Sequence, residues 1–265
     1  MPENEPREEA SEAYRSIRLH VEALPEAGGL LTLPREQAHY LTRVMRLGPG
    51  ARVALFNAGQ GEWTARIESA GRHDCVVALE RRTRAPAPPA SDVWLLFAPL
   101  KRNATDLVVQ KATELGAAAI LPVLTRRGVA QRTNLERLQA IAVEAAEQSE
   151  RLDVPRLAEP VPLADLLGDW PEGRGLYVCD ETGQGLPAAP ALTMAGRGPA
   201  AILCGPEGGF TPEELDLLRR FPFATHLHLG PRILRAETAA LAALAVWQAV
   251  CGDWRDPPSR SGTGF

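Results

Sequence analysis

The stretch ILCGPEGGFTPEEL, residues 202–215, decides the fold because it joins a short apolar run directly to the start of a helix. Thr211 is a favourable N-cap residue, Pro212 suits the first helical position, and Glu214 completes a capping box. The glycines before Thr211 therefore occupy a turn between a strand and a helix. Such a turn is typical of an α/β sheet, in which ligands bind at the carboxyl ends of the strands.

The ligand of this first loop is not expected to be a phosphate. A P-loop would end in a Lys-Ser/Thr pair and a dinucleotide-binding turn would have GxGxxG spacing, and neither pattern is present. Glu207 stands among Gly205, Gly208 and Gly209, and its carboxylate would repel a phosphate but tolerate an amine or a sulfonium. The alternative is a tight turn whose glycines serve the backbone alone.

A second loop lies within LHLGPRILRAETAALAALAVWQ, residues 227–248. Its aliphatic pair, Ile233 and Leu234, is flanked by Arg232 and Arg235, whereas an ordinary connection would carry polar turn residues. This pattern indicates a half-buried cleft with an apolar wall and a charged mouth. Core packing of the aliphatic pair is the alternative.

Around these loops, residues 92–252 alternate between strand and helix patterns. Strands are predicted at 93–98, 118–124, 175–179, 200–204 and 225–229, and helices at about 103–115 and, after the N-cap Asn134, at 134–151. This alternation predicts a mostly parallel sheet with helices on both faces.

The segment RAPAPPAS, residues 84–91, is rich enough in proline to predict a stiff linker between two domains. Before it, strand patterns at 29–33, 51–57, 62–69 and 74–80 predict a small β barrel or sheet. A helix at about 34–46 interrupts them, with Ala38, Leu41 and Met45 on one face. The predicted organisation is an acidic tail (1–14), a β domain (15–83), the linker (84–91), an α/β domain (92–252) and a disordered tail (253–265).

The charge of the chain is unevenly distributed. The net charge is −4, yet residues 15–90 carry 11 arginines against 7 acidic side chains. This local excess favours a polyanionic partner for the N-terminal half.

Other features argue against membrane and metal. No run of about 18 apolar residues and no secretory signal is present, so a cytoplasmic location is expected. The four cysteines lack CxxC spacing and are predicted to be reduced and buried. His226 and His228 share a face of a predicted strand without a third ligand, so packing or a hydrogen bond is favoured and no metal is expected.

The two loops, GPEGGFTPEE and LGPRILRAETA, resemble signature motifs of the RsmE-type RNA methyltransferases, members of the SPOUT class. The resemblance continues in KATELGAAAILPVLTRRGV (111–129), EAAEQSERLDVP (144–155) and HYLTRVMRLGPGARVALFNAGQG (39–61), and covers residues 15–252. One departure is Ala236, where the family usually has threonine, so any hydroxyl contact there is lost.

The resemblance implies a PUA-like RNA-binding β domain followed by an α/β methyltransferase domain with a deep trefoil knot. It implies a homodimer that binds S-adenosyl-L-methionine and methylates N3 of one uridine in 16S rRNA of the small ribosomal subunit. The first loop would then hold a cofactor with a cationic sulfonium.

Site residues are carried over by motif. Arg235 is the candidate for stabilising the developing uracil oxyanion, and Glu237, ahead of Glu207, is the candidate base, with helix capping as its alternative. The predicted cofactor-binding residues are Leu203, Cys204, Gly205, Glu207, Gly209, Leu229, Gly230, Ile233, Leu234 and Thr238. The predicted RNA phosphate contacts are Arg18, Arg43, Arg46, Lys101 and Arg126, each of which could instead be a solvated surface cation.

Two other functions stay open from the sequence. One is a SPOUT-fold protein that binds RNA without catalysis or methylates another RNA. The other is a metabolic α/β enzyme that uses a nucleotide, against which the missing phosphate motifs argue.

Overall fold

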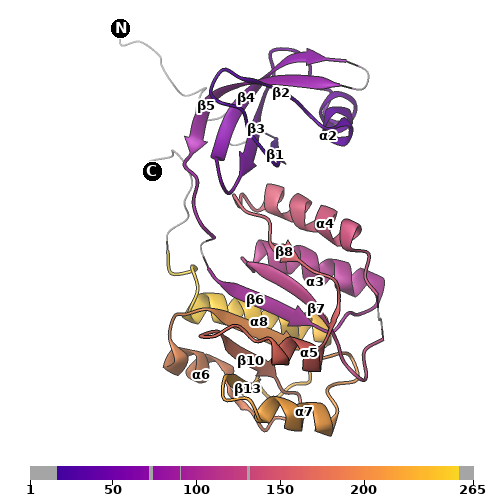
Figure 1. Ribbon diagram of the computed structural model, residues 1–265, viewed down its shortest axis with the longest axis vertical. Helices are drawn as coiled ribbons and strands as arrows, with labels where there is room; N and C mark the ends of the chain where they lie inside the picture. The colour runs from indigo at the N-terminus through magenta and orange to yellow at the C-terminus, as the bar shows by residue number, and fades with distance from the viewer. Residues whose placement is uncertain (1–16, 72–73, 90, 130–131, 257–265) are drawn as a thin grey trace. The chain divides into compact units, whose positions relative to one another are not determined.

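The computed structural model describes residues 17–71, 74–89, 91–129 and 132–256 (Figure 1). The chain divides into two compact units: unit 1 comprises the described residues of 17–88 together with 150–153, and unit 2 comprises those of 89–149 and 154–256. The predicted acidic tail, 1–14, lies outside the described residues. Residues 253–256 form turns, and Asp253 N donates to Gln248 Oε1 at 3.1 Å, so the folded chain extends into the predicted C-terminal tail.

Unit 1 is built on a five-stranded sheet in the order β1-β3-β4-β5-β2. Its strands are β1 (Arg18–His20), β2 (Leu30–Thr32), β3 (Arg52–Asn57), β4 (Gly61–Ala70) and β5 (Cys75–Arg84). β1 runs parallel to β3 and the other pairs are antiparallel. Alternate residues of β5, Cys75, Val77 and Leu79, face the core because side chains along a strand point to opposite faces. The predicted β fold is confirmed, although the sequence did not reveal β1.

The helical segment of unit 1 differs from the prediction. It consists of α2 (Arg35–His39) followed by a π-helix, η2 (Tyr40–Val44). Ala38 and Leu41 are buried as predicted, but Met45 is 40% exposed and not on the core face. The reason is that Met45 N bonds Tyr40 O at 2.9 Å, five residues back, and this wider turn rotates Met45 away from the core.

Unit 2 contains a sheet in the order β11-β13-β10-β12-β6-β7-β8, with β9 paired to β7, and all of its strand pairs are parallel. Its strands are β6 (Val93–Phe97), β7 (Ala119–Leu124), β8 (Arg156–Leu157), β9 (Val161–Pro162), β10 (Gly175–Cys179), β11 (Leu186–Pro187), β12 (Ala200–Cys204) and β13 (Ala224–His228). Its helices are α3 (Arg102–Glu114), α4 (Leu135–Gln148), α5 (Leu163–Gly168), α6 (Ala188–Ala195), α7 (Pro212–Arg219) and α8 (Ala236–Val250). The predicted α/β class with a parallel sheet is confirmed.

The two faces of this sheet carry separate cores. Helices α3, α4, α6 and α8 share one hydrophobic cluster, in which Leu95, Ile120 and Ile202 are buried. Helices α5 and α7 cover the other face, against Leu96, Val178 and Leu203. Figure 1 shows α8, in yellow, alongside β6, which it contacts. Helices therefore cover both faces, as the alternation predicted.

Several short elements of unit 2 were not predicted. Among them, α6 follows Pro187 and carries Pro190 within its first turn, where a missing backbone N–H does not break a helix. The prolines thus made this helix hard to predict from the sequence, although their positions at its start are compatible with it. No helix in the described part of the chain has the length and apolar character needed to cross a membrane.

Candidate functional site

Register of the parallel sheet brings the two predicted loops to one edge. Cys179 of β10 is paired with Cys204 of β12 on one side and with Leu227 of β13 on the other. The chain therefore leaves all three strands at the same level, and parallel strands have their carboxyl ends at one edge. The first loop (residues 205–211) and the second loop (residues 229–235) flank a middle loop that begins at Asp180.

The first loop has the helix start that the sequence predicts. Thr211 Oγ1 accepts from Glu214 N, and Glu214 Oε2 accepts from Thr211 N at 2.8 Å, which is a complete capping box. Two of its glycines have internal reasons to be glycine. Gly209 has φ +68°, and a Cβ there would overlap the Glu181 carboxylate, while a Cβ on Gly205 would stand 2.9 Å from the buried Phe210 ring.

Side chains from two neighbouring loops hold the first loop in place. Glu181 Oε1 accepts from Phe210 N at 2.9 Å. Arg127 Nη1 donates to the carbonyl oxygens of Gly208 at 3.0 Å and Phe210 at 3.3 Å. Glu214 Oε1 also accepts from Arg126 N at 2.7 Å. The loop is thus fixed from both sides before any ligand arrives.

The sequence did not single out Glu181 or Arg127. Glu181 follows the carboxyl end of β10 with one residue between, and Arg127 lies shortly after β7. Their positions just beyond strand ends were the available signal. Nothing in the sequence indicated which residues of those loops would point toward the first loop.

A buried carboxylate organises the middle loop. The fully buried side chain of Asp180 accepts from Thr182 N at 2.9 Å and from its hydroxyl at 2.6 Å, lies 2.9 Å from His226 Nδ1, and is 3.6 Å from an Arg219 guanidinium nitrogen. Burial would raise the pKa of Asp180, but the hydrogen bonds from Thr182 and His226 outweigh it and lower that pKa. This network fixes the residue next to Glu181.

His226 therefore makes a hydrogen-bond contact with Asp180, which is one of the two roles, packing or a hydrogen bond, that the sequence favoured over metal binding. Its Nε2 is buried without a partner among the described residues. Within 17–71, 74–89, 91–129 and 132–256, no group of three His, Cys, Asp or Glu side chains could hold a metal ion. All four cysteines are free and buried, as predicted.

The second loop exposes its aliphatic residues. Ile233 is 92% exposed and Leu234 is half-buried, so core packing of Ile233 is excluded. Gly230 has φ +101° and open space beside it, a backbone conformation that L side chains rarely adopt. Arg232 and Arg235 are both exposed. The loop presents apolar and cationic groups to solvent.

Arg235 and Glu237 stand at the start of α8. Arg235 is the N-cap residue and makes no side-chain cap, while Glu237 lies half-buried in the first turn, where a carboxylate favours the helix dipole. Thr238 is exposed beside them. Neither Arg235 nor Glu237 forms an ion pair with any described residue.

Two predicted cofactor-binding residues have their side chains in the core. Leu203 is fully buried in the cluster beneath α5 and α7. Cys204 is buried in the opposite cluster, with its Sγ 3.5 Å from Cys179 Sγ. Because successive strand residues point to opposite faces, neither side chain points along the strand toward the loops. Leu229 is partly buried against the core, and the exposed Glu207 is free of it.

The predicted RNA contacts lie in both units. Arg18 is not a free surface cation: its side chain is 10% exposed, pairs with Glu62 at 2.7 Å and lies 4.1 Å over the Phe56 ring. Arg43 and Arg46 are exposed in unit 1, and Lys101 and Arg126 are exposed in unit 2. Among the five predicted contacts, Arg18 thus has a largely buried and paired side chain, and the other four side chains are exposed.

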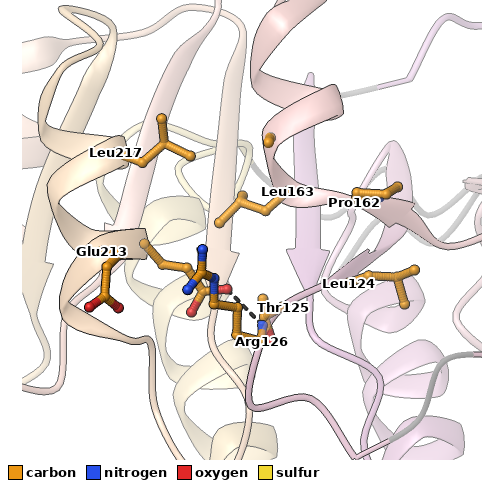
Figure 2. A pocket seen from close by; sticks show the side chains of 9 residues that line it. Leu124, Thr125, Arg126, Pro162, Leu163, Glu213 and Leu217 are labelled. Carbon is orange, nitrogen blue, oxygen red and sulfur yellow. Dashed lines mark hydrogen bonds between the residues drawn. The ribbon is translucent and has the colours of Figure 1, made fainter.

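A pocket of about 330 Å³ lies beside the first loop, between α5, α7 and the end of β7 (Figure 2). Leu124, Leu163 and Leu217 form its apolar walls, and Arg126 and Glu213 stand at its polar side (Figure 2). None of the predicted cofactor-binding residues lines it. The pocket is thus distinct from the edge where the two loops meet.

Two family models and several curated relatives match this chain. The family model described as RNA methyltransferase domain matches residues 87–248, and that described as RNA methyltransferase PUA domain matches residues 33–80. Ribosomal RNA small subunit methyltransferase E of Rickettsia conorii is 34% identical over 78% of this chain and 84% of its own length. That of Synechocystis is 34% identical over 88% of this chain and 76% of its own.

Solved structures of methyltransferases are also similar to this chain. A Legionella pneumophila methyltransferase in complex with the cofactor SAM has a TM-score of 0.79 at 30% identity, covering 90% of this chain and 99% of that one. Ribosomal RNA small subunit methyltransferase E from Neisseria gonorrhoeae, bound to S-adenosyl methionine, has a TM-score of 0.79 at 26% identity, covering 91% and 100%. The chain belongs to the ribosomal RNA small subunit methyltransferase E family of RNA methyltransferases.

Proposed function

We propose that this protein transfers a methyl group from S-adenosyl-L-methionine to N3 of a uridine in 16S rRNA of the small ribosomal subunit. The observation that carries the proposal is the pair of loops at one sheet edge, the first held by Glu181 and Arg127 and the second exposing Ile233 and Arg235. Relatives named small subunit rRNA methyltransferases, with SAM-bound neighbours in structure, support the substrate and the cofactor.

The residues of the two loops suit this cofactor. The first loop offers backbone groups and the exposed carboxylate of Glu207, which favours an amine or a sulfonium over a phosphate. The exposed side chain of Ile233 and the open side of Gly230 offer an apolar surface and close backbone approach. The bound cofactor would supply an electrophilic methyl group. The residues proposed to hold it are Gly205, Glu207, Gly209, Leu229, Gly230, Ile233, Leu234 and Thr238, with Leu203 and Cys204 supporting them from the core.

Arg235 and Glu237 are proposed to act on the uracil. Removal of the N3 proton places negative charge on the ring oxygens, which the Arg235 guanidinium would stabilise. Glu237 would accept the proton, since its carboxylate lies two residues further along α8 without an ion pair to any described residue. Glu207 is the second candidate for the base.

We also propose that the protein is a cytoplasmic homodimer and that its methyltransferase domain forms the trefoil knot of its class. Large apolar side chains of unit 2 support the dimer, because Met194 is 87% and Leu186 is 55% exposed. A second copy would bury such groups. Light scattering on the purified protein would measure the mass in solution.

The test uses labelled S-adenosyl-L-methionine and small subunits from cells that lack this activity. Digestion of the rRNA followed by mass spectrometry should reveal 3-methyluridine at one site. Arg235→Gln should lower the rate about 10²- to 10³-fold, as loss of an oxyanion donor does. Glu237→Gln should lower it about 10²- to 10⁴-fold, as loss of a general base does.

Matched controls are available in the same loops. Arg232→Gln removes an exposed arginine three residues from Arg235, and Glu207→Gln tests the other carboxylate. Equal losses of methylation rate for Arg232→Gln and Arg235→Gln would mean that Arg235 contributes only positive charge and makes no specific contact with the oxyanion. Cofactor binding with methylation of a different RNA, or of none, would overturn the substrate.

A further inference from the structure

The pocket between α5, α7 and the end of β7 has an apolar lining that the proposed methyl transfer does not use. Its walls are Leu124 at the end of β7, Leu163 in α5 and Leu217 in α7 (Figure 2). Leu124 and Leu217 are aliphatic and yet only half-buried. Apolar walls with a few polar groups beside them are typical of a site for a small molecule.

The size and rigidity of the pocket suit a ligand of about the size of an amino acid. Its volume of about 330 Å³ lies at the lower end of the range in which proteins bind small molecules, about 300–1,000 Å³. Leu163 is 4% exposed, and Glu214 Oε1 holds the backbone N–H of Arg126 at 2.7 Å. The walls are therefore fixed before a ligand arrives, which lowers the entropic cost of binding.

Two opposite charges line this pocket without pairing. The exposed side chain of Arg126 makes no hydrogen bond or ion pair with any described residue, and the exposed Glu213 makes no ion pair with one. The backbone N–H of Glu213 and the Thr211 hydroxyl lower the pKa of Glu213, and the guanidinium groups of Arg126 and Arg127 lower it further. Arg127 donates to carbonyl oxygens of the first loop. Arg126 is therefore the cation of this pair that is available to a ligand.

This arrangement of charge selects the class of ligand. An anion would be attracted by Arg126 and repelled by Glu213, and a cation would meet the reverse. A molecule that carries a carboxylate and an ammonium group on one carbon atom can form a charge-assisted hydrogen bond with each side chain. The apolar walls require, in addition, an apolar substituent on that carbon atom.

We propose that this pocket binds a free α-amino acid with an apolar side chain. Arg126 binds the carboxylate of the ligand, and Glu213 binds its ammonium group. The side chain of the ligand lies against Leu124, Leu163 and Leu217. The proposal does not depend on the proposed methyl transfer, because none of the predicted cofactor-binding residues lines the pocket.

The test measures the affinity of the full-length protein for four probes by saturation-transfer NMR. L-leucine has both charges and the apolar group, isocaproate lacks the ammonium group, isoamylamine lacks the carboxylate, and glycine lacks the side chain. The wild type should bind L-leucine at least about tenfold more tightly than isocaproate or isoamylamine, because each analogue loses one hydrogen bond between charged groups. Glycine should not displace L-leucine.

Two variants assign the two charges to their partners. Arg126→Gln should abolish the preference for L-leucine over isoamylamine and keep the preference over isocaproate. Glu213→Gln should do the reverse. Asp216→Asn is the matched control, since Asp216 is an exposed carboxylate of the same helix that does not line the pocket, and it should bind all probes as the wild type does. Thermal unfolding verifies that each variant is folded.

Three results would overturn the proposal. They are no binding of L-leucine to the wild type, equal affinity for L-leucine, isocaproate and isoamylamine, and an equal loss for all three probes in Arg126→Gln. N-acetyl-L-leucinamide, which has the leucine side chain without either charge, represents a leucine within a polypeptide. If it binds as tightly as L-leucine, the pocket recognises a protein side chain and the assignment to a free amino acid is wrong.

Discussion

Adjacent glycines of the first loop differ in why they are glycine. Gly209 has a left-handed φ and no room for a Cβ beside Glu181. At Gly208 a Cβ would make only ordinary contact with the Arg127 side chain, at 3.6 Å. Gly209→Ala should therefore cost about 1–2 kcal/mol in backbone conformation alone and weaken cofactor binding, whereas Gly208→Ala should do neither. Calorimetric titration with S-adenosyl-L-methionine, together with thermal unfolding, measures both, and equal effects would contradict this account.

Asp180 makes the free energy of unfolding depend on pH in the acid range. Because its pKa is lower in the folded state, its contribution is present above the unfolded value of about 3.9 and is lost as the pH falls through the folded value. Asp180→Asn should reduce the free energy of unfolding by about 1–3 kcal/mol near neutral pH. This difference from the wild type should shrink below about pH 4.

Urea unfolding at a series of pH values measures that difference. Asp216→Asn is the control, since Asp216 is an exposed partner of the same Arg219. A difference for Asp180→Asn that stays constant down to pH 3 would show that its ionisation is not what stabilises the loop.

Residue identity predicted one kind of site residue and missed another. The capping box at Thr211 and the turn at Gly209 are local, so the sequence contains the whole reason for them. Glu181 and Arg127 reach the first loop from distant segments, and only the folded sheet places them there. Leu203 shows a further limit, because the sequence does not tell that the side chain of this residue next to the loop points into the core.

At the scale of elements, helix α7 is tied to the end of β7 through one buried carboxylate. Glu214 accepts from Thr211 N within the helix cap and from Arg126 N across the sheet edge. Glu214→Ala should leave the buried Thr211 N–H and the partly buried Arg126 N–H without their acceptor and reduce stability by about 2–4 kcal/mol. Glu213→Ala, one residue earlier and exposed, should change little. Thermal unfolding compares them, and similar losses would mean that negative charge at the helix start, and not the two hydrogen bonds of Glu214, stabilises this corner.

Elements with a strong local pattern were predicted and those without one were not. The apolar runs of β6, β7, β10 and β12 are long enough to be recognised, and turn residues bound them. The two-residue strands β8, β9 and β11 exist only because a neighbouring strand pairs with them. The π-helix η2 is a different case, since its sequence reads as an ordinary amphipathic helix.

For the whole molecule, the cysteines report on the two units separately. Cys75 lies in unit 1, and Cys179, Cys204 and Cys251 lie in unit 2. Burial raises the pKa of Cys75 and Cys251, and contact with Cys179 together with burial raises that of Cys204. Native protein should therefore react slowly with a thiol reagent.

As the urea concentration rises, unfolding of unit 1 should make one thiol reactive, and unfolding of unit 2 should make the other three reactive. Cys75→Ala identifies the first, and mass spectrometry of labelled peptides identifies the rest. A thiol that reacts in native buffer at the rate of free cysteine would show that its unit opens without denaturant.

Composition predicts two parts of the chain, but it does not predict the path of the chain within them. The proline-rich segment and the change from β to α/β pattern indicate two parts. Strand order is a property of pairing between distant segments, and periodicity says nothing about a knot. Only the resemblance of the two loops to a known family implied one.

The buried amide of Gln248 has a consequence for how the protein is made. Its Nε2 donates to Leu115 O at 2.7 Å and to Ser91 Oγ at 3.0 Å, which joins the last helix to the beginning of unit 2. A ribosome adds Gln248 only after residues 91–247 have been made, so Ser91 and Leu115 lack this partner while that stretch is translated. A nonsense mutation before that codon yields a polypeptide in which Leu115 O and Ser91 Oγ lack the Gln248 amide, and we expect proteases to degrade it. The first strand and helix of unit 2 therefore gain these hydrogen bonds only once α8 has been translated.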